Sequence, residues 1–114
     1  MNTSSALDSL KALAQEHRLA LYRLLVQAGS AGMPVGMLGE RLGLPGATLS
    51  NHLNILRAAG LVRDSREGRV IRCRADYARM DALLAYLTEN CCAGDRAACA
   101  PPIACAPTSR RKSR

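Results

Sequence analysis

Apolar side chains recur every three or four residues in five segments of the chain, and this spacing predicts five amphipathic helices. The helices are expected at about residues 5–15, 17–28, 34–42, 45–59 and 77–89, the last with Asp76 as its N-cap. The second segment is apolar around much of its circumference, which indicates a helix at the centre of a small bundle. Gly43-Leu44-Pro45 predicts a tight turn between the third and fourth helices.

Between residues 61 and 74 the pattern changes to the alternation that is typical of β-strands. The two strands, 61–66 and 69–74, flank Glu67-Gly68 and are predicted to form a β-hairpin. Two short helices joined by a tight turn and followed by a hairpin describe a winged helix-turn-helix. The predicted fold class is therefore mainly α with a small β-hairpin.

The length of 114 residues allows one domain, whose core must be aliphatic because the chain has neither Trp nor Phe. We place this domain at residues 1–90. Residues 91–114 are predicted to be a flexible, cysteine-bearing tail, since their prolines forbid a continued helix. No apolar run is long enough to span a membrane and the first residues lack a signal-peptide pattern, so the expected location is the cytoplasm.

The formal net charge of +7 favours a nucleic-acid partner. Part of this charge is a basic run in the last five residues, which is either a solvated tail or a source of non-specific attraction to phosphates. The hairpin carries five further arginines: Arg63, Arg66, Arg69, Arg72 and Arg74. We expect Arg66 and Arg69 to contact DNA phosphates and the minor groove, whereas Arg72 and Arg74 can also be explained as a solvated face.

The fourth helix has short polar side chains on its outer face near the N-terminus: Thr48, Ser50, Asn51, His52 and Asn54. Ser, Thr and Asn are weak helix formers, so this set is better explained by hydrogen bonds to base edges in the major groove than by solvation. Thr48 or Ser50 can alternatively bond to the helix backbone. His52 can instead pack on the second helix, and Arg57, one turn later, is placed for a phosphate.

Four of the five cysteines lie within fifteen residues: Cys91, Cys92, Cys99 and Cys105. In a reducing cytoplasm, clustered thiols indicate a metal site or a redox sensor rather than a disulfide framework. Cysteines of no particular function in a tail are a further alternative. The fifth, Cys73, stands beside apolar residues of the second strand and is interpreted as a small buried residue.

Several motifs match a known family in order along the chain: Leu38-Gly39-Glu40-Arg41-Leu42-Gly43-Leu44, Ser50-Asn51-His52-Leu53-Asn54-Ile55-Leu56, Ala59-Gly60-Leu61-Val62 and Arg66-Glu67-Gly68-Arg69. Over residues 8–90 the chain resembles the ArsR/SmtB family of metal-responsive repressors. The resemblance implies a homodimer joined through the first and last helices and bound to a palindromic operator. It also implies an inducer that lowers the affinity for DNA.

The resemblance also bears on where an inducer binds. A Cys-x-Cys arsenic site on the first helix of the helix-turn-helix has no counterpart here, because residues 34–40 hold no cysteine. A zinc site on the last helix is not expected, because residues 76–89 hold no histidine. The segment Glu89-Asn90-Cys91-Cys92 resembles arsenic repressors whose ligands lie at the end of the last helix. This implies Cys91, Cys92 and Cys99 as ligands, with Cys105 as a possible substitute for the third.

Three thiolates suit trivalent arsenic or antimony, which take three sulfurs in a pyramid, better than zinc, which requires a fourth ligand. The sequence thus predicts a homodimeric repressor that releases operator DNA when it binds trivalent arsenic or antimony. A thiol-based redox-sensing repressor of the same fold and a small arsenic-sequestering metallochaperone without DNA binding are the alternatives. An enzyme is not expected, since no phosphate-cradling loop surrounds any cysteine.

Overall fold

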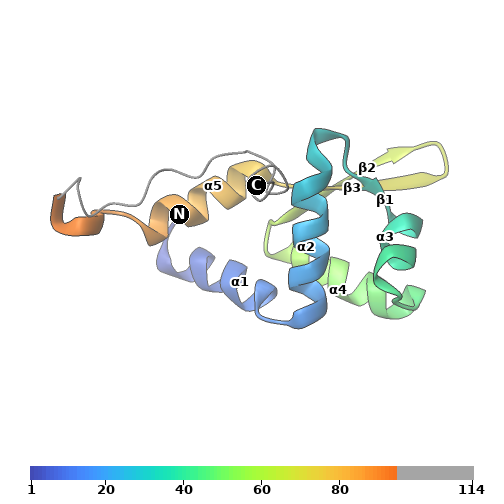
Figure 1. Cartoon of the computed structure of the whole chain (residues 1–114), viewed down its shortest axis with the longest axis horizontal. Helices are drawn as coiled ribbons and strands as arrows, with labels where there is room; N and C mark the ends of the chain where they lie inside the picture. Colours follow the sequence, from blue (N-terminus) through green and yellow to red (C-terminus); the bar gives the residue numbers. More distant parts are fainter. Residues whose placement is uncertain (95–114) are drawn as a thin grey trace, which may run out of the picture.

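The computed structural model describes residues 1–94, and within them it has five α-helices and a three-stranded sheet (Figure 1). The helices are α1 (Thr3–Leu13), α2 (Glu16–Ala28), α3 (Val35–Leu42), α4 (Gly46–Ala58) and α5 (Tyr77–Leu87). The strands are β1 (Met33–Pro34), β2 (Val62–Glu67) and β3 (Val70–Ala75), and two short 3₁₀ turns are η1 (Gly29–Ala31) and η2 (Cys91–Gly94). The predicted winged helix-turn-helix fold is confirmed, with helix ends that shift by one or two residues.

Local capping explains where the helices begin and end. The Asp76 side chain accepts a hydrogen bond of 3.1 Å from the backbone N–H of Arg79, which confirms the predicted N-cap of α5. Asn2 and Gln15 cap α1 and α2 in the same manner. Gly43 adopts the left-handed conformation (φ 65°, ψ 34°) that ends α3, so the tight turn before α4 forms where it was predicted.

The sheet contains one strand that the sequence analysis did not predict. The strand order is β1-β3-β2, all antiparallel, with Met33 opposite Cys73 and Asp64 opposite Cys73 on the other side. Gly32 makes the approach of β1 possible: its φ is +67°, and a Cβ atom there would lie 2.2 Å from the carbonyl oxygen of Cys73. Only glycine fits this position, because both its conformation and its contact exclude a side chain.

The core is aliphatic, as predicted, and α2 lies at its centre. Leucines from α2, α3, α4 and the start of the wing are fully or almost fully buried: Leu21, Leu25, Leu38, Leu53, Leu56 and Leu61. Helix α5 is tied to α2 by the Tyr77 hydroxyl, which donates a 2.8 Å hydrogen bond to the carbonyl oxygen of Val26. Within residues 1–94 no helix is both long and apolar enough to cross a lipid bilayer.

The arrangement separates two ends of the molecule. Helices α1 and α5 lie together at one end, and α3, α4 and the β2–β3 hairpin lie at the other (Figure 1). The hairpin projects beyond the helices, as the wing of a winged helix does. The start of α4 and the tip of the wing are therefore remote from the α1–α5 end, whereas the C-terminal part of α4 contacts α1.

Candidate nucleic-acid interface

Helix α4 has one buried face and one exposed polar face. Leu49, Leu53 and Leu56 are at most 3 % exposed and fix the helix on the core. Four residues on the opposite face are exposed to solvent: Thr48, Ser50, Asn51 and Asn54. A helix with a row of short hydrogen-bonding side chains on its outer face is the element that reads base edges in the major groove.

The structure corrects the interpretation of His52 as a DNA-reading residue. Its side chain is only 8 % exposed and packs against His17 of α2, with the ring centroids 5.7 Å apart. Burial lowers the pKa of His52, and the positive charge of Arg18 lowers it further, so the imidazole is neutral at physiological pH. His52 therefore belongs to the contact between α2 and α4 rather than to the exposed face of α4.

The sequence predicted that Arg57 contacts a DNA phosphate, but its guanidinium group is paired within the protein. Its Nε lies 2.8 Å from Oδ2 of Asp64 on β2, and its Nη1 donates a 2.7 Å hydrogen bond to Oδ1 of Asn54. Both charged side chains are about one third exposed (31 % and 30 %). Arg57 thus joins the outer face of α4 to the wing, and its positive charge is compensated by Asp64.

Cys73 on β3 extends the network of Asn54, Arg57 and Asp64 into the core of the protein. Its Sγ donates a 3.3 Å hydrogen bond to Oδ1 of Asp64, its partner across the β2–β3 pair, and its side chain is fully buried. Burial, reinforced by the hydrogen bond to Asp64, raises the pKa of the Cys73 thiol to about 12. The predicted burial of Cys73 is confirmed, but the residue is a hydrogen-bond donor as well as an apolar filler.

The arginines of the wing fall into two groups. Arg72 forms a 3.1 Å ion pair with Glu67 and also donates to the carbonyl oxygen of Ala31. Arg74 donates to the carbonyl oxygen of Ser30 at 2.8 Å and to the hydroxyl of Ser65. These two arginines tie the hairpin to η1 and do not form a free solvated face.

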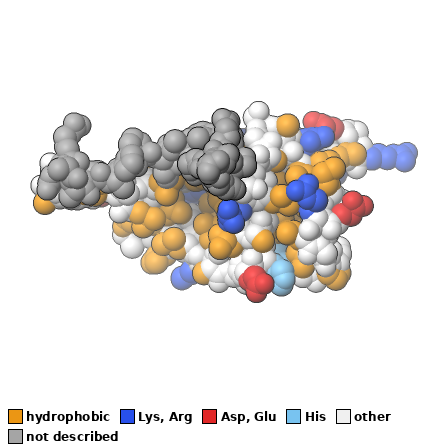
Figure 2. All heavy atoms as spheres, viewed as in Figure 1, with side chains coloured by type: hydrophobic (Ala, Val, Ile, Leu, Met, Phe, Trp, Pro, Cys, Tyr) orange, Lys and Arg blue, Asp and Glu red, His pale blue; other side chains and the backbone are white. Residues whose placement is uncertain are grey.

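Arg66 and Arg69 form the second group. Both are exposed, and neither has an ion pair or hydrogen bond with any residue in the part of the chain that the structure describes. They lie on either side of the Glu67–Gly68 turn, and basic side chains project from this end of the molecule (Figure 2). Uncompensated guanidinium groups on a protruding hairpin are suited to DNA phosphates.

The predicted metalloid ligands are only partly within the described residues. Cys91 is exposed and Cys92 is half-buried in η2, directly after α5, whereas Cys99 and Cys105 lie outside the described residues. Among residues 1–94 no three His, Cys, Asp or Glu side chains are grouped so that they could hold a metal ion. Helix α5 ends at Leu87, and Asn90 (φ 56°) and Cys92 (φ 61°) are in left-handed conformations. The predicted extension of this helix to Glu89 is therefore wrong by two residues.

Comparison with known proteins agrees with this geometry. A helix-turn-helix domain model matches residues 13–64. The transcriptional activator HlyU from Vibrio cholerae is 32 % identical over 91 residues, which are 80 % of this chain and 82 % of HlyU. The structure of an ArsR-like transcriptional regulator from Rhodococcus sp. RHA1 is similar, with a TM-score of 0.65 and 31 % identity over 74 % of this chain and 76 % of that chain.

The chain belongs to the ArsR family of transcriptional regulators. A further similar structure is the homodimeric winged helix-turn-helix DNA-binding domain of a possible ArsR-family regulator from Mycobacterium bovis. It has a TM-score of 0.60 and 30 % identity, and the match covers 76 % of this chain and 81 % of that chain. In this ArsR-family protein α4 is accordingly the recognition helix and the β2–β3 hairpin is the wing.

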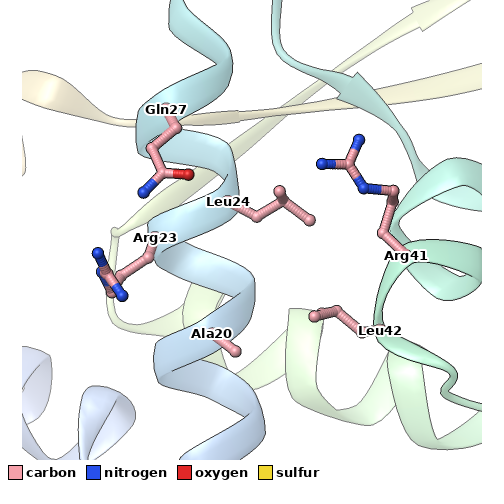
Figure 3. Close-up of a pocket in the computed structure, with 6 residues that line it drawn as sticks. All are labelled: Ala20, Arg23, Leu24, Gln27, Arg41 and Leu42. Carbon is pink, nitrogen blue, oxygen red and sulfur yellow. The ribbon is translucent and has the colours of Figure 1, made fainter. Parts of the chain in front are cut away.

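One surface hollow of this ArsR-family protein is lined by two arginines but does not form an anion site. It has a volume of about 260 Å³ and lies between α2 and α3, lined by Ala20, Arg23, Leu24, Gln27, Arg41 and Leu42. Leu24 points from α2 toward α3, and Arg23 and Gln27 line the hollow from the side of α2 that is opposite to Arg41 in this view (Figure 3). The guanidinium groups of Arg23 and Arg41 therefore do not converge on one point where a ligand could bind both.

Sequence reasoning missed Asp64 as part of the interface of this ArsR-family protein. The signal was present: Asp64 lies between two arginines of the strand, Arg63 and Arg66. A carboxylate between arginines favours an ion pair, but the sequence alone does not identify its partner. The partner is Arg57 on another element, and only the packing of β2 against α4 brings the two together.

Proposed function

We propose that this protein is a homodimeric transcriptional repressor that reads a palindromic operator with α4 and the wing. The observation that carries the proposal is the exposed row Thr48, Ser50, Asn51 and Asn54, joined to the wing through Arg57 and Asp64. The row supplies hydrogen bonds to bases, and Arg66 and Arg69 supply phosphate contacts beside them. Because the ion pair links the two elements, they present a single surface to DNA.

The α1–α5 end is suited to pair with a second copy of the chain. Three large apolar side chains are exposed on these two helices: Leu7 (47 %), Leu10 (39 %) and Leu87 (54 %). Hydrophobic side chains gather over this region of the surface (Figure 2), and α1 and α5 are held to each other by a hydrogen bond between Thr3 and Tyr86. Such a patch, remote from the wing, supports a two-fold interface that leaves both recognition helices accessible.

We propose trivalent arsenic, or antimony, as the inducer, held by the thiolates of Cys91, Cys92 and Cys99. The end of α5 supports this donor set. Side chains of neighbouring residues diverge by about 100° on a helix. Cys91 and Cys92 lie beyond α5, in a segment with left-handed backbone at Cys92, so helical geometry does not force their thiols apart. A three-sulfur donor set fits a thiophilic, three-coordinate ion.

The release mechanism follows from the position of this site. An inducer cannot act here by unwinding a helical turn at Glu89–Asn90, since α5 has already ended at Leu87. We propose instead that capture of the ion by Cys91 and Cys92 reshapes the segment after α5 and displaces the end of that helix. Because α5 belongs to the proposed dimer interface, the displacement changes the spacing of the two recognition helices. A misfit of a few ångströms from the half-site spacing is enough to weaken operator binding.

The test is a band-shift titration of the full-length protein on DNA from the promoter of its own operon. The reduced protein is expected to retard this DNA, and arsenite is expected to release it, whereas zinc is not. Release by an oxidant and its reversal by dithiothreitol, without an effect of arsenite, would instead support the redox sensor. Tight arsenite binding by a protein that never retards the DNA would support the metallochaperone.

A further inference from the structure

We propose that Asn54 is a specificity-determining residue that presents only its amide NH₂ group to the operator. It therefore selects a base edge that carries acceptors alone, that of guanine or thymine. This inference rests on the proposed reading of DNA by α4. It concerns which base is read at one position of each half-site, and it is independent of the inducer.

The orientation of the Asn54 amide follows from the chemistry of its neighbour. Nη1 of Arg57 donates to Oδ1 of Asn54 at 2.7 Å. A guanidinium group has only donors, so the amide oxygen must face it and the amide nitrogen must point away. The side chain of Asn54 is exposed, and its NH₂ group is left available on the outer face of α4.

Arg57 is itself held in place on its other side. Its Nε pairs with Oδ2 of Asp64 at 2.8 Å, and Oδ1 of Asp64 accepts from the thiol of Cys73 at 3.3 Å. Cys73 is fully buried in β3, the central strand of the sheet. The network thus runs from a fixed buried group through Asp64 and Arg57 to Asn54, and Arg57 is a positioning residue within it.

This orientation changes what Asn54 can recognise. A free asparagine side chain reads adenine with both of its groups, since its NH₂ donates to N7 and its oxygen accepts from the N6 amino group. Here Arg57 uses one lone pair of the Asn54 oxygen and fixes the amide with that oxygen turned toward itself, so the oxygen and the NH₂ group cannot both turn to one adenine edge. The major-groove edge of guanine offers two acceptors and that of thymine offers O4, whereas adenine offers one acceptor beside a donor that is left without a partner, and cytosine offers only a donor.

Asn51, one turn earlier on the same exposed face, is an internal comparison. Its side chain has no hydrogen bond to any residue in the described part of the chain, so both of its amide groups are available to DNA. The two asparagines have the same side chain on the same helix and differ in whether Arg57 fixes the amide. They are therefore expected to differ in the bases that they accept.

The experiment uses the full-length protein and an operator selected from a pool of randomised DNA duplexes. Affinities are then measured by fluorescence anisotropy for all four base pairs at each half-site position, at one salt concentration. For the wild type, one position should favour guanine or thymine over cytosine by roughly tenfold. Thermal melting of every variant verifies that it is folded.

Asn54→Asp is the decisive variant, since it replaces the amide NH₂ by an acceptor of the same shape. The other oxygen still accepts from Arg57, so preference at this one position should invert to cytosine, whose amino group donates. Asn51→Asp is the matched control and should alter a different position. If Asn54→Asp leaves every base preference unchanged, or if the wild type prefers adenine at the affected position, the inference is wrong.

Arg57→Met provides an independent route to the same answer, because it removes the donor and keeps a long side chain. The freed amide of Asn54 should then gain the adenine contact, with a severalfold rise in relative affinity for adenine at that position. The slope of affinity against salt should stay unchanged, since a phosphate ligand would lower it by about one. A wild type without any sequence preference would overturn the proposed function itself, whereas normal selectivity with an unresponsive Asn54→Asp overturns only this inference.

Discussion

Nε of Arg57 lies 2.8 Å from Oδ2 of Asp64, and this ion pair joins the recognition helix to the wing. The two residues are on different elements, and β2 also packs directly against α4, so the ion pair adds to an existing contact between the helix and the wing. Asp64 is in turn hydrogen-bonded to the buried thiol of Cys73. The ion pair thus connects the DNA-reading face of α4 to the centre of the sheet.

The contribution of this pair to folding stability should be small. Both side chains are about one third exposed, and exposed ion pairs contribute roughly 0–1 kcal/mol because water and salt screen them. In a double-mutant cycle with Arg57→Ala and Asp64→Ala, urea unfolding should give a coupling free energy of at most about 1 kcal/mol. A coupling of several kcal/mol would mean that the pair maintains the fold rather than the geometry of the interface.

The two groups of wing arginines should behave differently on substitution. Arg69→Ala removes an uncompensated charge, so operator affinity should fall at all sequences and the slope of log affinity against log salt should decrease by about one. Arg72→Ala removes a charge already paired with Glu67 and should change that slope less. Both are measured by anisotropy between 50 and 200 mM salt, about the range over which phosphate contacts are lost. Equal slopes for the two variants would contradict the division of the wing arginines into a paired and an unpaired group.

The raised pKa of Tyr22 predicts that folding stability decreases at alkaline pH. Burial raises its pKa from 10.0 to about 12, and nearby carboxylates add to the effect, so the folded state disfavours the phenolate. Its contribution is complete below pH 10, the ordinary pKa in the unfolded chain, and is lost as pH rises toward 12. The expected loss in unfolding free energy from this group is about 2 kcal/mol between pH 10 and 12.

Tyr22→Phe tests this directly by urea unfolding at pH 7 and pH 11. The hydroxyl of Tyr22 is buried and has no hydrogen-bond partner among the residues that the structure describes. Its removal should therefore be neutral or stabilising at pH 7, and the alkaline decline should become shallower. A loss of more than about 1 kcal/mol at pH 7 would show that the hydroxyl is satisfied in solution.

Much of the fold could be predicted because local signals coincide with it. The apolar spacing placed all five helices, and Asp76 and Gly43 marked a beginning and an end correctly. Strand β1 could not be predicted, because two residues carry no alternation. It forms only because Gly32 lets the chain approach Cys73 on β3, and that is a contact between distant segments.

The exposed face of α4 was predictable for the same reason, and the exceptions on it have tertiary causes. Histidine is a residue type that can read DNA bases, but the position of His52 on the helix turns its side chain toward His17 on α2. Arginine is a residue type that binds phosphates, but Arg57 forms an ion pair with Asp64. In both cases the partner is on another element, and helical periodicity does not reveal it.

The remaining prediction concerns the cysteines, and it separates them by exposure and chemistry. Cys91→Ser, Cys92→Ser and Cys99→Ser should each still bind the operator, because none of these residues is in α4 or the wing. Each should respond to arsenite only at concentrations at least tenfold higher, since a hydroxyl is a poor ligand for a thiophilic ion. The measurement is the arsenite concentration that releases half of the bound operator in a band-shift titration.

Cys73→Ser is the matched control for these variants. Its thiol is fully buried and its pKa is raised to about 12, so it supplies no thiolate at neutral pH, and a serine hydroxyl can still donate to Asp64. This variant should be induced normally. Cys105→Ser should also be near normal. If Cys99→Ser keeps full sensitivity and Cys105→Ser loses it, Cys105 is the third ligand. If every variant of the clustered cysteines is induced like the wild type, arsenic sensing through this cluster is ruled out, although operator binding by α4 and the wing would stand.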